Sequence, residues 1–262
     1  MINAIEKLQN KVSELADPDI DPEFHARVSV LQVGGHLHID FRGSPFDEPF
    51  NELCATLVRP EVATVLGSLS LRSPDESSNG TCNWDLALLV DAESSFPNLR
   101  SFSVAKNEPG NQNRVIIGAD YDEDGVLGRL LHKSPSLNTL IVPSAPDATF
   151  FSMKHPSLHY LSVDSGYDTQ NFIGNLADNS CFPELRALEF GEFNETYLDD
   201  FPNGCTPFED YRRLFTSPHF ASVRYFVWRN SVCSEEQIAV LRSLRPKRDL
   251  QIQIVRFSAW YV

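Results

Sequence analysis

The sequence is short of basic residues and has no long hydrophobic run. Its 262 residues include 22 Lys and Arg against 36 Asp and Glu, which gives a formal net charge of −14. Nucleic acids and anionic lipid surfaces attract basic proteins, so we expect neither as a partner. A membrane-spanning helix needs about 18 or more consecutive apolar residues, and because no such run occurs we expect no membrane segment.

The sequence has few cysteines, and their spacing matches no paired-cysteine motif. There are five, an odd number, and none forms a C-x-x-C pair; they are Cys54, Cys82, Cys181, Cys205 and Cys233. We expect reduced, mostly buried thiols in a cytoplasmic chain. The first fifteen residues, MINAIEKLQNKVSEL, lack the continuous apolar core of a signal peptide.

The motifs of common catalytic and nucleotide-binding sites are also missing. The sequence contains no G-x-S-x-G, Walker loop, G-x-G-x-x-G or H-E-x-x-H, and no motif places a serine or cysteine beside a base. We therefore expect no enzymatic activity, no catalytic residue and no cofactor.

What the sequence does contain is a repeated phrase, P-x-L-x-x-L-x-φ, where φ is apolar. Full copies begin at Pro97, Pro135, Pro156 and Pro183, and weaker ones at Leu66 and Val223. Its last two apolar positions alternate as on a strand that buries one face. Such strands share one core when they stack in a parallel sheet with return segments outside. The predicted fold is α/β, a leucine-rich-repeat solenoid with a concave parallel sheet and with helices and loops on the convex side.

The copies are unevenly spaced. From Leu66 they start 33, 38, 21, 27 and 38 residues apart, whereas such repeats are about 20 to 29 residues long. We therefore expect insertion loops over residues 107–124 and 191–207. Asn107 is the one asparagine at the ninth repeat position, where it would bond the backbone at the bend. Helical spacing predicts convex-side helices over 84–90, 125–132, 170–177, 208–215 and 235–244.

We assign residues 1–60 to an N-terminal cap and 61–262 to the repeats and a C-terminal cap strand. Apolar spacing predicts an amphipathic helix over 2–15 that packs on the open end, with a coiled-coil dimer seam as the alternative. Arg27–Val33 and His36–Phe41 flank two glycines and predict a β-hairpin. A short helix is expected near 51–57 and a terminal strand over 250–257, with Trp260 and Tyr261 as candidates to cover its edge.

One acidic segment resembles half of a calcium loop. Asp120, Asp122 and Asp124 alternate before a glycine, as in D-x-D-x-D-G, but Leu131 stands where the bidentate Glu is needed. The alternative is an acidic loop in which Asp124 caps the following helix. The sequence leaves open whether this loop binds a cation.

A second candidate metal cluster lies in the predicted hairpin. His36, His38 and Asp40 share one strand face, and these residue types can bind zinc. A fourth protein ligand is not apparent nearby. The exposed face of a cap hairpin explains the three equally well, so we assign no metal ligand.

The concave face is the main candidate for binding. Alternation turns the following residues to solvent there: Ser68, Ser70, Arg72, Ser101, Ser103, Lys106, Thr139, Ile141, Tyr160, Ser162, Asp164, Ala187, Glu189, Glu192, Tyr225, Val227, Arg229 and Asn230. Binding hot spots favour aromatic and Arg side chains. Our candidate partner-binding residues are Tyr160, Asp164, Glu189, Glu192, Tyr225, Arg229 and Asn230.

Three phrases carry a family resemblance. They are residues 156–166, residues 182–190 and, most specifically, Val223–Ser231 followed by the helix predicted over 235–244. With them, the stretch from Phe96 to about Leu244 resembles a family of bacterial cytoplasmic leucine-rich-repeat proteins of unknown function. The resemblance implies a solenoid in a bacterial cytosol and supplies no catalytic residue.

Two functional hypotheses follow. The first is a non-catalytic scaffold that docks a protein, preferably a basic one, on the concave face; one specific form is an immunity or inhibitor protein. We expect such a scaffold to be a cytoplasmic monomer. The second is a calcium- or zinc-binding module, or a metal-dependent enzyme, that uses one of the two clusters above.

Overall fold

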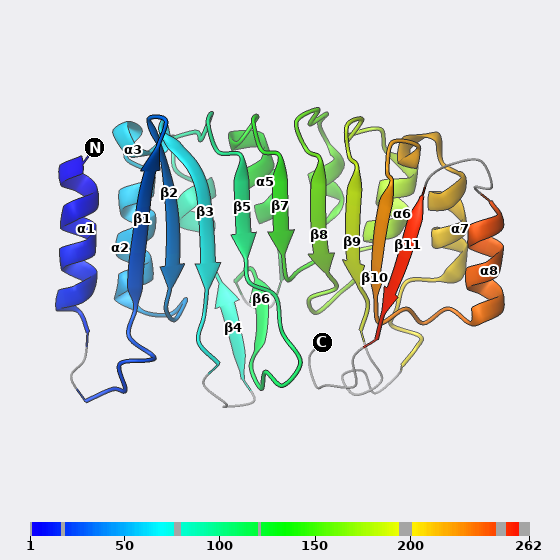
Figure 1. Cartoon of the computed structure of the whole chain (residues 1–262), viewed down its shortest axis with the longest axis horizontal. Helices are drawn as coiled ribbons and strands as arrows, with labels where there is room; N and C mark the ends of the chain where they lie inside the picture. The colour runs from blue at the N-terminus through cyan, green and yellow to red at the C-terminus, as the bar shows by residue number, and fades with distance from the viewer. Residues whose placement is uncertain are drawn as a thin grey trace.

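The chain forms a mixed α/β fold around a nine-stranded, mostly parallel sheet (Figure 1). The computed structural model describes residues 2–16, 19–75, 80–119, 122–193, 201–244 and 250–256. The strands, in their order across the sheet, are β1 (Arg27–Val33), β2 (His36–Arg42), β3 (Leu66–Arg72), β5 (Ser101–Val104), β7 (Thr139–Val142), β8 (Tyr160–Asp164), β9 (Ala187–Gly191), β10 (Tyr225–Arg229) and β11 (Gln251–Val255). β1 and β2 pair antiparallel, and every later pair is parallel.

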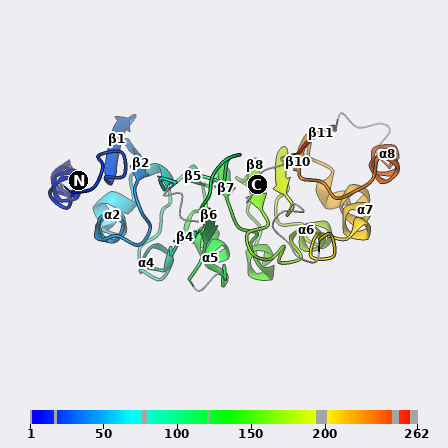
Figure 2. The ribbon, with the colours of Figure 1, turned by 90° about the horizontal axis from the view of Figure 1, so that it is seen from below.

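The helices lie on one face of this sheet and at its ends. They are α1 (Ile2–Glu14), α2 (Glu48–Leu57), α3 (Pro60–Ala63), α4 (Ala87–Val90), α5 (Val126–Lys133), α6 (Phe172–Asp178), α7 (Phe208–Thr216) and α8 (Glu235–Ser243), with 3-10 turns η1 (Ala148–Phe151) and η2 (Pro218–Phe220). Figure 2 shows α2, α4, α5, α6 and α7 on the outer side of a curved molecule. The inner face of the sheet, which none of the described helices covers, is called the open face below.

The buried residues of the strands form rows across the sheet. Leu140, Leu161, Leu188 and Phe226 occupy the same register position on four neighbouring strands, and each is almost fully buried. They belong to one hydrophobic cluster that reaches from Ala4 to Leu241. Because side chains alternate along a strand, the residues between these positions lie on the open face.

Most of the expected elements are present. A strand forms at each of the six copies of the repeated phrase, and the hairpin forms around Gly34 and Gly35. The return between β7 and β8 is too short for a long helix and holds only the short turn η1. Asn107 bonds the backbone as expected, because its amide donates to the Asn113 carbonyl at 2.5 Å and accepts from the Val115 N–H at 2.9 Å.

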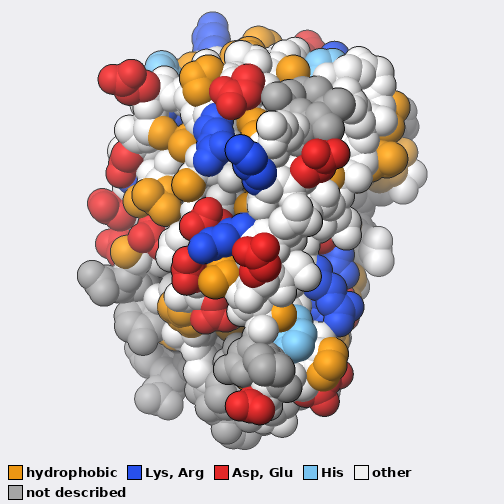
Figure 3. All heavy atoms as spheres, turned by 90° about the vertical axis from the view of Figure 1, so that its left-hand side faces the viewer, with side chains coloured by type: hydrophobic (Ala, Val, Ile, Leu, Met, Phe, Trp, Pro, Cys, Tyr) orange, Lys and Arg blue, Asp and Glu red, His pale blue; other side chains and the backbone are white. Residues whose placement is uncertain are grey.

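α1 packs against the first edge of the sheet. Ile5, Leu8 and Val12 are buried, and the Gln9 amide donates to the Val28 carbonyl of β1 at 3.2 Å. The predicted packing on the open end is therefore present, and the apolar stripe that a coiled-coil seam would need is already used. The outer surface at the α1 end of the molecule carries charged side chains of both signs among scattered apolar ones (Figure 3).

Two expectations are wrong. Residues 84–90 form a helix only over α4, because Trp84 ends a strand, β4 (Thr81–Trp84). The expected loop at 107–124 contains β6 (Arg114–Ile117), which pairs parallel with β4 in a second, two-stranded sheet. Trp84 is fully buried against Phe41 and Phe50, with ring centroids 6.1 and 4.9 Å away. A four-residue strand gives too short a pattern to distinguish period 2 from period 3.6, and tertiary packing decides.

Some predictions fall on residues outside the described ranges. These are Asp120 of the calcium-like loop, the aromatics Trp260 and Tyr261, and residues 194–200 of the second insertion. Within the described ranges, no helix has the length and apolar character needed to cross a membrane.

Candidate functional site

The open face presents its side chains in rows, because the parallel strands pair in register. One row runs from Ser70 on β3 through Ser103, Ile141 and Ser162 to Glu189 on β9. Serines and Arg72 occupy this face of β3 and β5, while Tyr160, Asp164, Glu189, Tyr225 and Arg229 occupy it on β8 to β10. The face is therefore chemically uneven from one end to the other.

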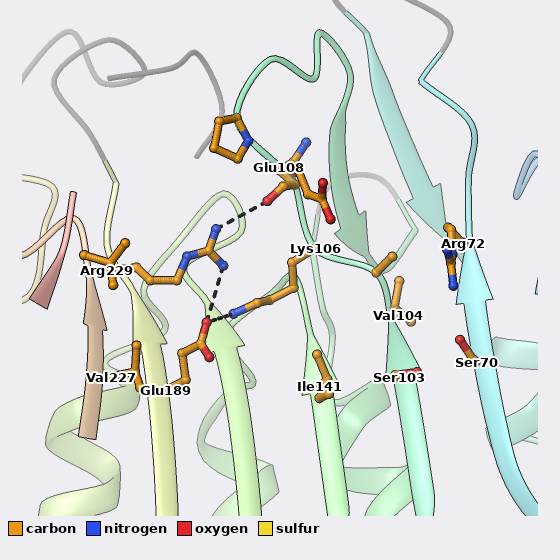
Figure 4. A pocket seen from close by; sticks show the side chains of 14 residues that line it. Ser70, Arg72, Ser103, Val104, Lys106, Glu108, Ile141, Glu189, Val227 and Arg229 are labelled. Carbon is orange, nitrogen blue, oxygen red and sulfur yellow. Dashed lines mark hydrogen bonds and ion pairs between the residues drawn. The ribbon is translucent and has the colours of Figure 1, made fainter. Parts of the chain in front are cut away.

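Four charged side chains, one each from β8, β9, β10 and the loop after β5, form a compact ionic cluster. Lys106 Nζ lies 3.0 Å from Asp164 Oδ1 and 2.8 Å from Glu189 Oε1, and it also donates to Ser162 Oγ at 2.8 Å. Arg229 Nη1 lies 3.1 Å from both Asp164 oxygens and 3.6 Å from Glu189 Oε1. In Figure 4, Lys106 and Arg229 reach Glu189 from opposite sides. The two cations are 10% exposed and the two carboxylates 19% exposed.

The ends of the strands bring this ionic cluster together. Asp164, Gly191 and Arg229 are the last residues of β8, β9 and β10 and occupy one register row. Lys106 follows β5 in a loop that reaches over the sheet, and Arg229 Nη2 donates to the carbonyl of Asn107 at 3.3 Å. The ionic cluster therefore fixes the loop after β5 to three strands that lie much later in the chain.

The ionic cluster contains two positive and two negative side chains, as partly buried charges require. The three N–H groups of Lys106 have three acceptors, so the lysine holds its neighbours in place. Tyr160 donates its hydroxyl to Glu189 Oε2 at 3.3 Å. Burial, reinforced by the Glu189 charge, raises the pKa of Tyr160, so the phenol remains a donor.

A hollow of about 560 Å³ lies beside the ionic cluster on the open face. Its lining includes Ser70, Arg72, Ser103, Glu108, Ile141 and Val227. A second hollow of about 290 Å³ adjoins it and shares Arg72, Lys106 and Glu108. Arg72 thus borders both hollows, opposite the ionic cluster (Figure 4).

The structure brings several of the predicted site residues together. Tyr160, Asp164, Glu189 and Arg229 are all members of the ionic cluster or bonded to it. Tyr225 is 53% exposed and lies on the open face next to Ala187. Arg229 is largely buried and committed to its ion pairs rather than directed to solvent.

Glu192 does not face solvent, and that expectation is wrong. It is 4% exposed, and its side chain accepts hydrogen bonds from the Tyr211 hydroxyl and from the Thr206 N–H at 3.2 Å. Strand β9 ends at Gly191, so the alternation that turns Glu189 outward stops before Glu192. Burial raises the pKa of the Glu192 carboxyl, which lies against α7.

Asn230 is also buried, contrary to the prediction. It follows the last residue of β10 with φ of 52°, in the left-handed region, and its N–H donates to the Val255 carbonyl at 2.8 Å. The alternation again ends with the strand. Asn230 therefore belongs to the bend after β10.

Sequence reasoning missed the importance of two residues. The sequence pattern predicts that Lys106 lies on the open face, but nothing local shows that it meets Glu189, 83 residues away. Gly191 carried a usable signal, since a glycine at an alternating strand position indicates a close approach by another group. A Cβ there would lie 2.3 Å from Asp164 Oδ1.

The acidic segment before α5 is organised by Glu123. Its Oε2 accepts from the Gly125 N–H at 3.1 Å and from the Asp147 N–H at 3.1 Å, and its Oε1 accepts from the Leu127 N–H. The prediction that Asp124 caps this helix is therefore wrong, because the buried Glu123 satisfies the first-turn amides. Burial also raises the pKa of Glu123. Asp122 Oδ1 accepts from the Asp124 N–H at 3.2 Å.

One histidine of the β2 cluster bonds to the neighbouring strand. His38 Nδ1 lies 2.9 Å from Ser68 Oγ on β3. In the part of the chain that the structure describes, no group of three or more His, Cys, Asp or Glu side chains is arranged to hold a metal ion.

All five cysteines are buried and free of disulfides, as the sequence predicts. Burial raises the pKa of Cys54, Cys205 and Cys233 to about 12, and the nearby Glu192 contributes at the last two. These thiols are therefore unreactive side chains of the interior.

Comparison with models of known protein families gives no match, and comparison with curated proteins gives none either.

Proposed function

We propose that the chain is a leucine-rich-repeat solenoid that acts as a non-catalytic scaffold and docks a protein partner on the open face. One observation carries the proposal: a nine-stranded sheet face that no described helix covers, with a hollow beside an internally neutral ionic cluster. Nine strands at about 4.8 Å span roughly 40 Å, and a standard protein interface needs roughly 800 Å² on each side. A surface of this extent suits a protein better than a small molecule.

The charge of the open face differs from that of the whole chain. Among its described residues we count five basic side chains, Arg27, Arg42, Arg72, Lys106 and Arg229, and four acidic ones, Asp40, Glu108, Asp164 and Glu189. The chain carries a net charge of −14 overall, and the acidic excess of its described residues therefore lies away from this face. It attracts a basic partner from a distance, whereas the open face itself supplies shape and specific polar contacts.

The same proposal includes a cellular setting. The reduced, buried thiols fit a cytoplasm, and the packed apolar stripe of α1 fits a monomer. A bacterial immunity or inhibitor protein that blocks a basic enzyme is one specific form of this scaffold.

The test is affinity capture from the native cell extract at low and moderate salt, with mass spectrometry of the retained proteins. Tyr225→Asp places a charge on the open face, and Leu88→Asp is its matched control on the helix side, because the two residues are 53% and 52% exposed. We expect one stoichiometric partner that Leu88→Asp retains and Tyr225→Asp loses. Equal capture by both variants would contradict docking on the open face.

The alternative function, a metal-binding module, predicts a different result. A ligand that binds only the folded chain raises its melting temperature. Calcium at millimolar concentration or stoichiometric zinc should leave the melting temperature of a scaffold unchanged, and a rise would favour the metal-binding function.

A further inference from the structure

We propose that Arg72, with the hydroxyls of Ser70 and Ser103, forms a subsite that binds a carboxylate side chain of the docked partner. This inference rests on the proposed docking function and specifies its chemistry. The subsite lies in the larger hollow of the open face, on the side opposite the ionic cluster (Figure 4).

The first observation is that the side chains of these three residues donate no hydrogen bond to a described residue. The Arg72 guanidinium forms an exposed ion pair with Asp40, whose Oδ2 lies 3.7 Å away, beyond hydrogen-bond distance, and both side chains are about half exposed. Guanidinium carries five N–H donors, so Arg72 retains its capacity for a bidentate partner.

Arg72 differs from Lys106 and Arg229, the other two cations that line the hollow. Lys106 has three acceptors, and Arg229 is bonded to Asp164 and to the Asn107 carbonyl. A ligand could bind either of these two side chains only by replacing internal hydrogen bonds. Arg72 is the cation of this lining that a ligand can engage without breaking an internal hydrogen bond.

The second observation is that the three donors are neighbours. Ser70 and Ser103 are paired across β3 and β5, and Arg72 follows Ser70 by two residues on the same face. Paired residues are about 5 Å apart, and alternate residues of a strand about 7 Å. The two hydroxyls and the guanidinium therefore border one end of the hollow.

The surrounding charges select the kind of anion. Glu108 lines both hollows, and no described residue forms a hydrogen bond or ion pair with its carboxylate. Glu189 lines the larger hollow from the other side. With Asp40 beside Arg72, three carboxylates surround the subsite, and they disfavour a doubly charged phosphate more than a singly charged carboxylate. A Lys or Arg next to the partner's carboxylate would meet Glu108, so a partner that is basic overall still fits.

The experiment is an NMR titration of the full ¹⁵N-labelled chain with three probes. They are the capped peptide acetyl-Gly-Gly-Glu-Gly-Gly-amide, its Gln counterpart and inorganic phosphate. We expect saturable shifts at Ser70, Ser103 and the Arg72 Nε–H with the Glu peptide and none with the Gln peptide. Arg72→Gln should weaken binding at least tenfold. Arg59→Gln, which removes an exposed arginine outside both hollows, should leave it unchanged.

Several outcomes would overturn the subsite. These are no saturable shift with the Glu peptide, equal binding by Arg72→Gln, or tighter binding of phosphate than of the peptide. Partner capture separates this inference from the proposed function. If wild type and Arg72→Gln capture a partner equally, the subsite is wrong and docking stands. If wild type captures none, docking fails, and the titration still decides the subsite.

Discussion

Gly191 leaves room for Asp164. The two residues are paired across β9 and β8, and a Cβ on Gly191 would lie 2.3 Å from Asp164 Oδ1. Because that space is empty, the carboxylate extends over β9 toward Arg229 on the next strand. The glycine thus acts as a positioning residue for the ionic cluster.

Gly191→Ala should destabilise the chain. Where the backbone permits it, Gly→Ala stabilises by about 0.4 to 1 kcal/mol because it restricts the unfolded chain. Here the added methyl collides with Asp164, so we expect a loss of roughly 1 to 3 kcal/mol in the free energy of unfolding. Urea denaturation measures it, and the cycle with Asp164→Ala should show coupling between the two sites. A Gly191→Ala variant as stable as wild type would contradict this account.

Lys106→Met should cost far more than the loss of a surface ion pair. The change leaves Asp164 and Glu189 with Arg229 as their remaining basic partner among described residues, and breaking such a partly buried arrangement costs roughly 3 kcal/mol. The control is Arg212→Met, which removes an exposed pair with Glu209 and should cost at most about 0.5 kcal/mol. Equal losses in urea denaturation would show that the ionic cluster adds no stability of its own.

Titration of Glu192 should make the folded chain less stable as the pH rises. The unfolded carboxyl titrates near its ordinary pKa of 4.5, and burial raises the folded pKa above that value. Between the two pKa values the folded chain binds more protons than the unfolded chain, so the free energy of unfolding decreases as pH rises through this window.

Glu192→Gln removes this titration. The stability of the variant relative to wild type should therefore increase from about pH 4.5 upward, as urea denaturation across pH would show. Glu6→Gln, which removes an exposed carboxyl of α1, is the matched control substitution. A constant difference between Glu192→Gln and wild type would mean that Glu192 titrates normally.

The cysteine thiols should not react with a thiol reagent in the native chain. All five are buried, and burial raises three of their pKa values to about 12, so little thiolate exists at pH 8. A thiol reagent should label none of them before denaturation and all five afterward. Rapid labelling of the folded chain would contradict their burial.

Salt should act mainly on the rate of partner association. The acidic excess of the described residues lies away from the open face, so we expect it to attract a basic partner over distance without forming the final contacts. Raising ionic strength from roughly 0.02 to 0.3 M shortens the screening length, and we expect the association rate to fall at least about tenfold. The dissociation rate, measured by surface plasmon resonance, should change little. The reverse pattern would place the acidic residues inside the interface.

The sequence by itself determined the strands and their buried faces. The repeated phrase buries Leu140, Leu161 and Leu188 at equivalent positions, because a strand has a period of two and only stacking buries its apolar side. Four-residue strands such as β4 and β6 lacked a long enough pattern. Six of the other strands could be predicted because each one forms at a copy of the repeated phrase.

Only the tertiary structure decided which charged residues meet. Glu189 and Glu192 are three positions apart, yet one faces the hollow and the other is buried against Tyr211, because β9 ends between them. Lys106 reaches Glu189 across 83 residues, since the stacking of strands brings the loop after β5 over β9. Local patterns set which face a side chain occupies. Contacts between distant segments depend on where each strand stops and how the strands stack.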